Sequence, residues 1–571
     1  MKRRQLQSLY LLVTATSISV IVAAAEPRFN WATVVNNNDL MPPLAVRHFN
    51  SYNQPSVNVE GLVVLRARSR GGPPLGPPTH GIYLRDMSVI DSPIVMVLDK
   101  TTRVPHPNNL DATFVETPSF PRIDMHSDTI ATRGNHGPTH RYFLGDGTET
   151  RAGTTGIYTN PYDNLITGAA KLGDIPDFDF YRVPEFSDTR FEVFPGAPAT
   201  TDGNTIVFKG NYTVGGIGKT GVYYRDLEPQ PAGGNSPAVM IANNTDTLIP
   251  GTHTVFGSTA PPNAADRKAV FAGFDDENAP TSGGIYLAPL QFQPSLTTLV
   301  SIGGRVPGES SKSVFSHLDE GIAFDGRYVG FWGAWGTETR TVRLYCHEEG
   351  NRDRIAYCNQ NLVCAGSGET ETLGDPDSVC DDADDPNFGT SCYTDREVPL
   401  QQGLFVHDIK TKKTQAVAKT GSDFDDYLFW SYSGKTPCVG SGHSSEGSED
   451  DGELVRWRSS AFVAVSARSG STYHFAFKAR TGELIDGVYA NPVDGIYLSK
   501  GPGQSKPVTL LDTTMDGLAV DPEAPAGSRI SELGIEREGL RGNWLAINAS
   551  MGVEGAEEED GMAGIYVTRL K

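Results

Sequence analysis

Short apolar runs alternate with polar loops along most of this chain. Each run is four to six residues long, is rich in β-branched or aromatic residues, and is bounded by Gly, Pro, Asn or Asp, as in Ala269-Val270-Phe271-Ala272-Gly273. That pattern is typical of short strands joined by tight turns. No segment keeps a sustained helical period. The pattern therefore predicts an all-β protein.

One phrase, a glycine followed by an aliphatic and an aromatic residue, occurs seven times. The copies lie 75, 65, 63, 119, 92 and 69 residues apart. They are Gly81-Ile82-Tyr83, Gly156-Ile157-Tyr158, Gly221-Val222-Tyr223, Gly284-Ile285-Tyr286, Gly403-Leu404-Phe405, Gly495-Ile496-Tyr497 and Gly564-Ile565-Tyr566. Such a repeat indicates one supersecondary unit stacked several times. Because the aromatic residue recurs in register, we expect it to pack between units rather than to form a sugar-binding platform.

Each unit reads as four antiparallel strands, which we name a, b, c and d in chain order. In the first copy, strand a runs from Phe49 towards Asn58-Val59-Glu60-Gly61, and strand b is Leu62-Val63-Val64-Leu65. The Asn-x-x-Gly or Asp-Gly between them suits a tight turn. Strand c carries the repeated phrase. Four-stranded units repeated radially are propeller blades, so the sequence predicts one seven-bladed β-propeller over residues 26–571.

The two ends of the chain predict how the ring closes. The chain ends on a strand c, and its N-terminal region offers an isolated strand, Trp31-Ala32-Thr33-Val34-Val35. We expect that strand to supply strand d of the last blade, which removes two open sheet edges. Two β-sandwiches or an open solenoid would explain short strands but not this sevenfold register.

The first unit resembles the repeat of secreted bacterial proteins with tandem NxxGxxAF units. The matching positions are Phe49, Tyr52, Pro55, Ser56, Val57, Asn58 and Gly61. Other copies depart from it, with Asp in place of Asn, and the sixth is poorly matched. The resemblance touches every blade and implies a propeller with an extracellular address. It implies no catalytic residue.

The N-terminus predicts secretion. Lys2, Arg3 and Arg4 precede an apolar stretch of about 15 residues, too short for a comfortable membrane span, and a small-residue cleavage site follows at Ala23-Ala24-Ala25. We therefore expect residues 1–25 to be a signal peptide and the mature protein to be extracellular, or periplasmic in a bacterium. Its removal changes the net charge from −21 to −24. That acidity argues against nucleic-acid and anionic-membrane partners.

Two long intervals contain acidic insertions. We expect the first at about residues 334–402, between strands b and c of blade 5, with a net charge of −9, and the second at about residues 436–455, with −5. In a secreted chain, an even number of cysteines predicts disulfides, whose pairing stays open. All six lie in these insertions: Cys346, Cys358, Cys364, Cys380, Cys392 and Cys438. The insertions are either a cap beside the channel or solvated loops.

Further candidate sites rest on shorter patterns. Six aspartates within eleven residues make calcium a candidate cofactor, although the EF-hand order is missing: Asp375, Asp377, Asp381, Asp382, Asp384 and Asp385. Sequons predict glycosylation at Asn211, Asn243 and Asn548. Polar residues on strand a are candidates to line the central channel: Asn50, Asn53, Glu116, His317, Asp319, Glu320, Glu532 and Glu536.

No catalytic motif is present, since the nucleophile elbow is missing and the two Gly-Lys-Thr stretches lack the rest of a phosphate loop. We therefore expect a secreted, monomeric, non-enzymatic propeller that binds an extracellular glycan, protein or surface component. The alternative is a secreted enzyme acting on a polysaccharide or a small ester, with acids and histidines at the funnel and with calcium as a candidate cofactor. A structural protein without a small-molecule site is the third hypothesis.

Overall fold

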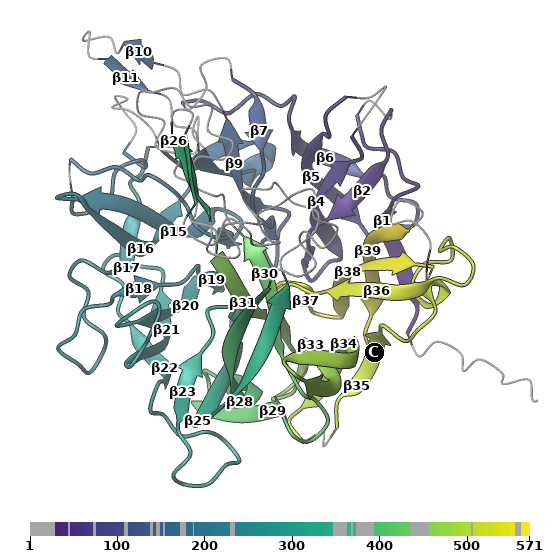
Figure 1. Cartoon of the computed structure of the whole chain (residues 1–571). Helices are drawn as coiled ribbons and strands as arrows, with labels where there is room; N and C mark the ends of the chain where they lie inside the picture. Colours follow the sequence, from purple (N-terminus) through teal and green to yellow (C-terminus); the bar gives the residue numbers. More distant parts are fainter. Residues whose placement is uncertain are drawn as a thin grey trace, which may run out of the picture.

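The computed structural model describes most of the chain after residue 28. The described residues are 29–43, 46–71, 76–107, 112–136, 141–143, 149–151, 155–171, 179–186, 188–228, 235–345, 362–366, 369–372, 393–433, 456–503, 506–553, 555 and 561–571. Seven antiparallel sheets of four main strands are arranged around one centre as a seven-bladed β-propeller (Figure 1). The predicted fold class is confirmed.

The first three blades follow the chain in order. Blade 1 contains β2 (Phe49–Tyr52), β3 (Ser56–Val57), β4 (Leu62–Ser69), β5 (His80–Asp86) and β6 (Val95–Asp99). Blade 2 contains β7 (Phe114–Glu116), β8 (Arg122–Ile123), β9 (Ile130–His136), β12 (Thr155–Thr159) and β13 (Ile166–Ala170), with the small hairpin β10 (Arg141–Phe143) and β11 (Glu149–Arg151) between strands b and c. Blade 3 contains β14 (Ala199–Thr201), β15 (Thr205–Val214), β16 (Ile217–Asp226) and β17 (Val239–Asn243).

The next two blades bring the first long connection. Blade 4 contains β18 (Ser258–Thr259), β19 (Asn263–Ala265), β20 (Lys268–Phe274), β21 (Gly283–Pro289) and β22 (Thr297–Ser301). Blade 5 contains β23 (Phe315–Leu318), β24 (Ala323–Phe324), β25 (Tyr328–Tyr345), β28 (Tyr393–Asp408) and β29 (Lys413–Lys419), and β26 (Leu362–Gly366) pairs with β27 (Glu369–Thr372) in its b–c connection.

The last two blades complete the ring. Blade 6 contains β32 (Val463–Ala467), β33 (Tyr473–Ile485), β34 (Val488–Gly501) and β35 (Val508–Asp512), and it is preceded by the hairpin of β30 (Leu428–Ser433) and β31 (Arg456–Ala461). Blade 7 contains β36 (Arg529–Gly534), β37 (Leu540–Arg541), β38 (Trp544–Gly552), β39 (Met562–Arg569) and β1 (Trp31–Asn36). Two 3₁₀ turns, Pro161–Asp163 and Gly517–Ala519, are the helical elements of the described residues.

The N-terminal strand closes the ring as the sequence predicted. β1 pairs antiparallel with β39, from Trp31 opposite Thr568 to Asn36 opposite Gly564. The two strands lie side by side in Figure 1. Val34 and Val35 are fully buried in the cluster between blades 7 and 1. The edge of β39 that would otherwise be open is therefore covered by β1.

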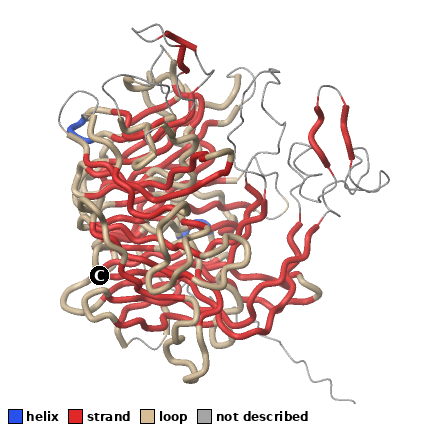
Figure 2. Tube along the Cα trace, turned by 90° about the vertical axis from the view of Figure 1, so that its left-hand side faces the viewer, coloured by secondary structure: helices blue, strands red, loops and turns tan. Residues whose placement is uncertain are grey.

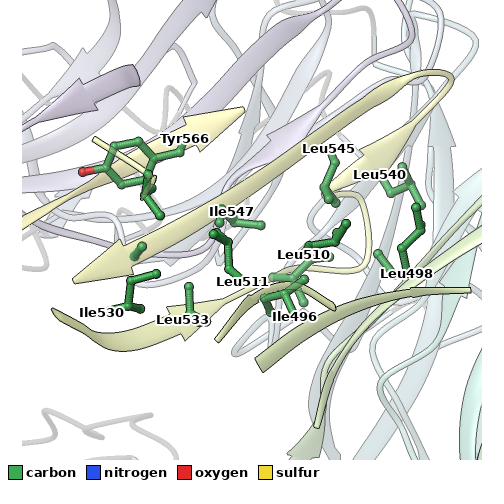
Figure 3. Packing of buried hydrophobic residues seen from close by; sticks show 14 of the residues in the cluster. Ile496, Leu498, Leu510, Leu511, Ile530, Leu533, Leu540, Leu545, Ile547 and Tyr566 are labelled. Carbon is green, nitrogen blue, oxygen red and sulfur yellow. The ribbon is translucent and has the colours of Figure 1, made fainter. Parts of the chain in front are cut away.

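The aromatic residue of the repeated phrase is part of the core in every blade, as predicted. Tyr83, for example, is 1% exposed, and its ring meets Phe49 of strand a edge to face at 5.0 Å. Edge-to-face pairs at 4.7–5.2 Å also join the aromatic ring of the phrase to a phenylalanine on strand a in blades 2 and 5, and to one that precedes strand a in blades 3, 4 and 6. Offset or edge-to-face contacts add to the burial of these rings. Aliphatic residues fill the space between neighbouring blades, as Ile496, Leu511, Leu533 and Ile547 do between blades 6 and 7 (Figure 3).

Two glycines of the repeat are fixed by close approach. At Gly81, an added Cβ would lie 2.5 Å from the carbonyl oxygen of Leu98 on strand d, where the register shifts between Ile82 and Tyr83. Gly61 has a φ of +100°, and its Cβ would lie 2.6 Å from Trp544 of blade 7. Both positions require glycine because a side chain would displace a neighbouring strand or blade.

Candidate functional site

The two faces of the propeller differ. The a–b and c–d turns lie on one face, which we call the turn face, and the b–c and d–a connections lie on the other, the loop face. On the loop face, the paired strands of blade 5 continue to Tyr345 opposite Tyr393, and those of blade 6 continue to Ile485 opposite Val488. These long strands rise beyond the stacked blades (Figure 2).

The long ribbons form a wall on one side of the loop face. The Arg343 N–H donates to the Gly487 carbonyl oxygen at 2.7 Å, which joins blade 5 to blade 6. The β30–β31 hairpin packs against them through Trp430 and Trp457. The paired strands of blade 5 occupy residues 334–345 and 393–402, so the connection itself, 346–392, is shorter than the insertion expected from the sequence. The second insertion, residues 436–455, lies outside the described residues.

A row of cationic residues follows the repeat on strand b. The position opposite the aliphatic residue of the phrase is basic in four blades and not in the other three. Its residues are Arg66, Arg133, Lys209, Ala272, Trp332, Lys478 and Asn548, in blade order. In blades 1, 2 and 3, the residue two positions earlier on the same face packs against the following blade. Because side chains alternate along a strand, the basic residues face that blade too, nearer the loop face.

The interface between blades 1 and 2 gathers most of this polar chemistry. The Arg66 guanidinium donates to Asn53 Oδ1 at 2.5 Å and to the Thr117 carbonyl oxygen of blade 2. Glu116 accepts a hydrogen bond from Asn135 Nδ2 at 3.4 Å. Thr117 Oγ1 lies 3.4 Å from His80 Nδ1. The carboxylate of Glu116 therefore lies near two arginines, Arg66 and Arg133, near His80, and near the side-chain amides of Asn53 and Asn135.

The electrostatics of this cluster are set by burial and by excess positive charge. Burial, together with the Arg66 and Lys100 charges, lowers the pKa of His80 to about 4, so its imidazole is neutral at pH 7. Burial lowers the pKa of Arg133 to about 10, against the opposing effect of Glu116. Both arginines keep their charge at neutral pH. Arg68 and Arg70 extend the cluster into solvent.

Three of the predicted channel residues belong to this cluster. Asn53 and Glu116 are described above, and Asn50 accepts a hydrogen bond from Arg70 Nε at 3.3 Å. We call the set Asn50, Asn53, Arg66, Arg68, Arg70, His80, Glu116, Arg133 and Asn135 the basic cluster.

The other predicted channel residues lie elsewhere and are not brought together. His317 lies on β23 with Nδ1 3.0 Å from Ser316 Oγ, and although more than a third of the residue is exposed, the partial burial of its ring lowers its pKa. Asp319 accepts the Ala461 N–H at 3.1 Å, and burial raises its pKa. Glu320 follows it and is half-buried, whereas Glu532 is exposed on β36.

The last of them, Glu536, belongs to a buried ion cluster. Arg122 of blade 2 contacts Glu536 at 3.2 Å and also contacts Glu538, both from blade 7. Arg541 donates to the carbonyl oxygens of Phe324 in blade 5, at 2.9 Å, and Val465 in blade 6, at 3.3 Å. We call Arg122, Glu536, Glu538 and Arg541 the central ion cluster. Arg122 is paired with both carboxylates, and Arg541 holds carbonyl oxygens of two other blades, so we assign the cluster to stability rather than to ligand binding.

Several sequence predictions fall outside the described residues. They include the signal peptide, the six aspartates offered as calcium ligands, and five of the six cysteines. The sixth, Cys364, lies on β26, whose side chains are not described. Within the described part of the chain, no group of three or more His, Cys, Asp and Glu residues could hold a metal ion. Among the described residues there is also no helix long and apolar enough to cross a membrane.

The three sequons differ in accessibility. Asn243 is fully buried, and its Oδ1 accepts the N–H groups of Thr245, Asp246 and Thr247. Asn548 is also buried, whereas Asn211 is half-buried on β15. Asn211 is the most accessible acceptor of the three, and glycosylation stays a prediction.

The strand-b cations were missed although the sequence carries a signal for them. The phrases Arg66-Ala67-Arg68, Arg133-Gly134-Asn135, Lys209-Gly210-Asn211 and Lys478-Ala479-Arg480 share a cation, a small residue and a polar residue. In blades 2 and 3 the small residue must be glycine, because a Cβ would lie 2.6 Å from a phenylalanine ring, Phe114 at Gly134 and Phe191 at Gly210. Aligning the repeats on strand b as well as on strand c would have found them.

Comparisons with known proteins show no family for this chain. No family model and no curated protein matches the chain. Among solved structures, the polysaccharide lyase Uly1 matches with a TM-score of 0.38 and 9% identity, over 97% of this chain and 94% of that one. A Trypanosoma rangeli sialidase with sialic acid has a TM-score of 0.31 and 9% identity, over 80% and 57% of the two chains. The endosialidase of phage phi92 has a TM-score of 0.27 and 9% identity, over 97% and 71%. At these values the likenesses carry no argument about activity.

Proposed function

We propose that this protein binds an acidic polysaccharide on the loop face of blades 1 and 2, through the basic cluster. The observation that supports this most is the concentration of positive charge in one blade of an acidic protein. Residues 46–103 hold seven Lys and Arg against four Asp and Glu, whereas the whole chain has a net charge of −21.

The side chains of the cluster suit carboxylate or sulfate groups on a sugar chain. Arginine presents parallel N–H donors that match both anions, and Arg66 and Arg133 share the single carboxylate of Glu116 as a nearby negative charge. Asn50, Asn53 and Asn135 add amide groups that can bind sugar hydroxyls. Arg68 and Arg70 are exposed and can meet a ligand that stays on the surface.

The acidic remainder of the protein favours this partner over other polyanions. Nucleic acid would bring continuous negative charge to a protein whose own net charge is −21, and the local basic cluster does not offset that repulsion. A polysaccharide that spaces its charges along a neutral backbone would meet less repulsion. The predicted secretion signal fits such an extracellular ligand.

Catalysis on the same polysaccharide is the second candidate, and His80 supports it. Its imidazole is neutral at pH 7, so a ring nitrogen has a lone pair for a proton, and a carboxylate bound at Arg66 would offset the positive charge that opposes protonation. A uronate carboxylate on Arg66 would have its adjacent carbon-bound proton acidified. His80 would take that proton, the electron pair would form a carbon–carbon double bond, and the glycosidic oxygen would leave and take a proton from water.

Binding is tested with three probes and two variants. Affinity for polygalacturonate, for dextran sulfate and for uncharged dextran is measured by calorimetry, and melting temperatures establish that each variant folds. We expect the acidic polymers to bind and dextran not to bind. Arg68→Gln and Arg133→Gln should each weaken binding about tenfold. Lys413→Gln, on exposed β29 beside the turn face, is the matched control and should have no effect.

Turnover is measured on the same polymers by the ultraviolet absorbance of an unsaturated uronate and by new reducing ends. If the protein is a lyase, His80→Gln should abolish the absorbance while binding persists. Binding without any new chain end would assign the protein to binding alone. Equal affinity for dextran and the acidic polymers would contradict the proposal.

A further inference from the structure

The basic cluster extends from the interface between blades 1 and 2 into the interface between blades 2 and 3. Arg133 Nε, Asn135 Oδ1 and Thr155 Oγ1 are buried and have no hydrogen-bond partner within the described residues. Asn135 and Thr155 are directly opposite each other on β9 and β12. Buried polar atoms are nearly always paired, so three orphans at one place indicate a missing partner with both donors and acceptors.

The next interface repeats the arrangement. Asn211 Oδ1 of blade 3 and Ser258 Oγ of blade 4 are likewise buried without a partner among the described residues. Asn211 lies opposite Thr220, whose hydroxyl is 3.3 Å from that of Thr259 in blade 4. Lys209 occupies the same strand position here as Arg66 and Arg133 in the two earlier blades.

The row ends abruptly after blade 3. The same strand position is Ala272 in blade 4 and Trp332 in blade 5, and Trp332 Nε1 is satisfied by Gln402 at 3.1 Å. Blades 5 and 6 then carry the wall of long ribbons. The cations of this strand position therefore cover three consecutive interfaces, with orphan polar atoms at the second and third, and the row of cations stops at blade 4.

We infer that the ligand is an extended acidic oligosaccharide that crosses the interfaces 1/2, 2/3 and 3/4 in turn, placing one anionic group at Arg66, one at Arg133 and one at Lys209. This inference rests on the proposed function. Packed sheets lie about 10 Å apart, so cations in register on neighbouring blades are separated by a similar distance. That distance is comparable with the length of a disaccharide in an extended chain.

A binding site that spans these three interfaces, which we call the three-interface footprint, makes affinity rise with the length of the oligosaccharide. A monomer or dimer fills one interface, whereas a longer chain engages the second and third without a new loss of translational freedom. The orphan atoms add a requirement for hydroxyl groups, because Asn135 Oδ1 needs a donor and Arg133 Nε needs an acceptor. A polyanion without hydroxyls, such as polyacrylate, would leave Asn135 Oδ1 unsatisfied.

The test is calorimetry of the full-length protein with galacturonate oligomers from monomer to octamer. We expect affinity to rise with length until the oligomer reaches the 3/4 interface and then to level off. Arg133→Gln should lower the affinity for the octamer about tenfold and leave that for the dimer unchanged. Lys209→Gln, a half-buried position, should lower only the affinity for the longest oligomers, by a few-fold, and Lys413→Gln should change none.

The possible outcomes distinguish a failure of this inference from a failure of the proposed function on which it rests. Equal affinity for all lengths, or a length dependence unaffected by both variants, overturns the three-interface footprint while acidic-sugar binding stands. Failure of every oligomer, the monomer included, overturns the proposed function and this inference with it. Polyacrylate of matched length binding as tightly as the octamer overturns the requirement for hydroxyl groups.

Discussion

At the scale of single residues, the choice between Asn and Asp at the a–b turn follows what the next blade offers. Asn58 Oδ1 accepts the N–H groups of Glu60, Gly61 and Leu62, and its Nδ2 donates to the Ser127 carbonyl oxygen of blade 2 at 3.1 Å. At the same turn, Asp124 of blade 2 accepts the Gly203 N–H of blade 3 at 3.2 Å. Blade 1 therefore needs a donor where blade 2 needs an acceptor.

Exchanging the two residue types tests that rule. Asn58→Asp should lower the free energy of unfolding by about 2–3 kcal/mol, because a carboxylate would face the Ser127 carbonyl oxygen in a buried position. Asp124→Asn should also destabilise, since its amide would face the Gly203 N–H. Chemical denaturation gives both values. Glu60→Gln, on the exposed part of the same turn, is the control, and equal stability of Asn58→Asp and wild type would contradict the rule.

The buried histidine of the basic cluster makes stability depend on pH. The pKa of His80 is about 4 in the folded protein against 6.5 as the ordinary value, so between these values the unfolded chain binds a proton that the folded chain does not. The free energy of unfolding should therefore fall as pH decreases through this window, by about 1–2 kcal/mol from this residue. Urea denaturation at several pH values measures the slope. His80→Gln should flatten it in part, because His474 is shifted in the same direction.

At the scale of elements, sequence periodicity predicted the strands well and the site poorly. Seven copies of one phrase fixed strand c, and its aromatic residue was correctly placed in the core, because packing imposes the same residue type on every blade. The site depends on where blades differ. Arg66 and Arg133 are half-buried between blades. The alternation of apolar and polar residues, which marks core and surface positions, therefore does not identify them. The strand-a residues were identified by residue type alone. Residue type does not distinguish Glu116, which lies close to arginines, from Glu532, which lies on an exposed strand.

The closing strand is the element whose loss should matter most. Deleting residues 26–43 removes β1, exposes the edge of β39 and uncovers the cluster that contains Val34 and Val35. We expect a lower melting temperature and aggregation through the open edge. A synthetic peptide of residues 29–43 added in trans should restore the melting temperature, and a peptide with Val34 and Val35 replaced by Asp should not. An unchanged melting temperature after deletion would contradict the closure.

At the scale of the whole molecule, the central ion cluster joins blades that are not neighbours as well as two that are. Arg122 connects blade 2 with blade 7, and Arg541 connects blade 7 with blades 5 and 6. No repeat pattern could predict this, because each of these residues occurs in one blade only. A ring held together across its centre is expected to unfold as one unit rather than blade by blade.

The central ion cluster also predicts a change in the sign of the pH dependence of stability. Burial alone would raise the pKa of Glu536, but Arg122 and Arg537 lower it below 4.5, so in the wild type this residue stabilises above that pH and the contribution is lost on acidification. Arg122→Met leaves Glu536 and Glu538 buried without that cation, which should cost about 3–5 kcal/mol at neutral pH. Their pKa values would then rise, so the variant should become more stable as pH falls from neutrality towards about 5, opposite to the wild type. Adding Glu536→Gln and Glu538→Gln should recover most of the loss and remove the slope. Parallel pH profiles for the wild type and Arg122→Met would show that the central carboxylates are not held by Arg122.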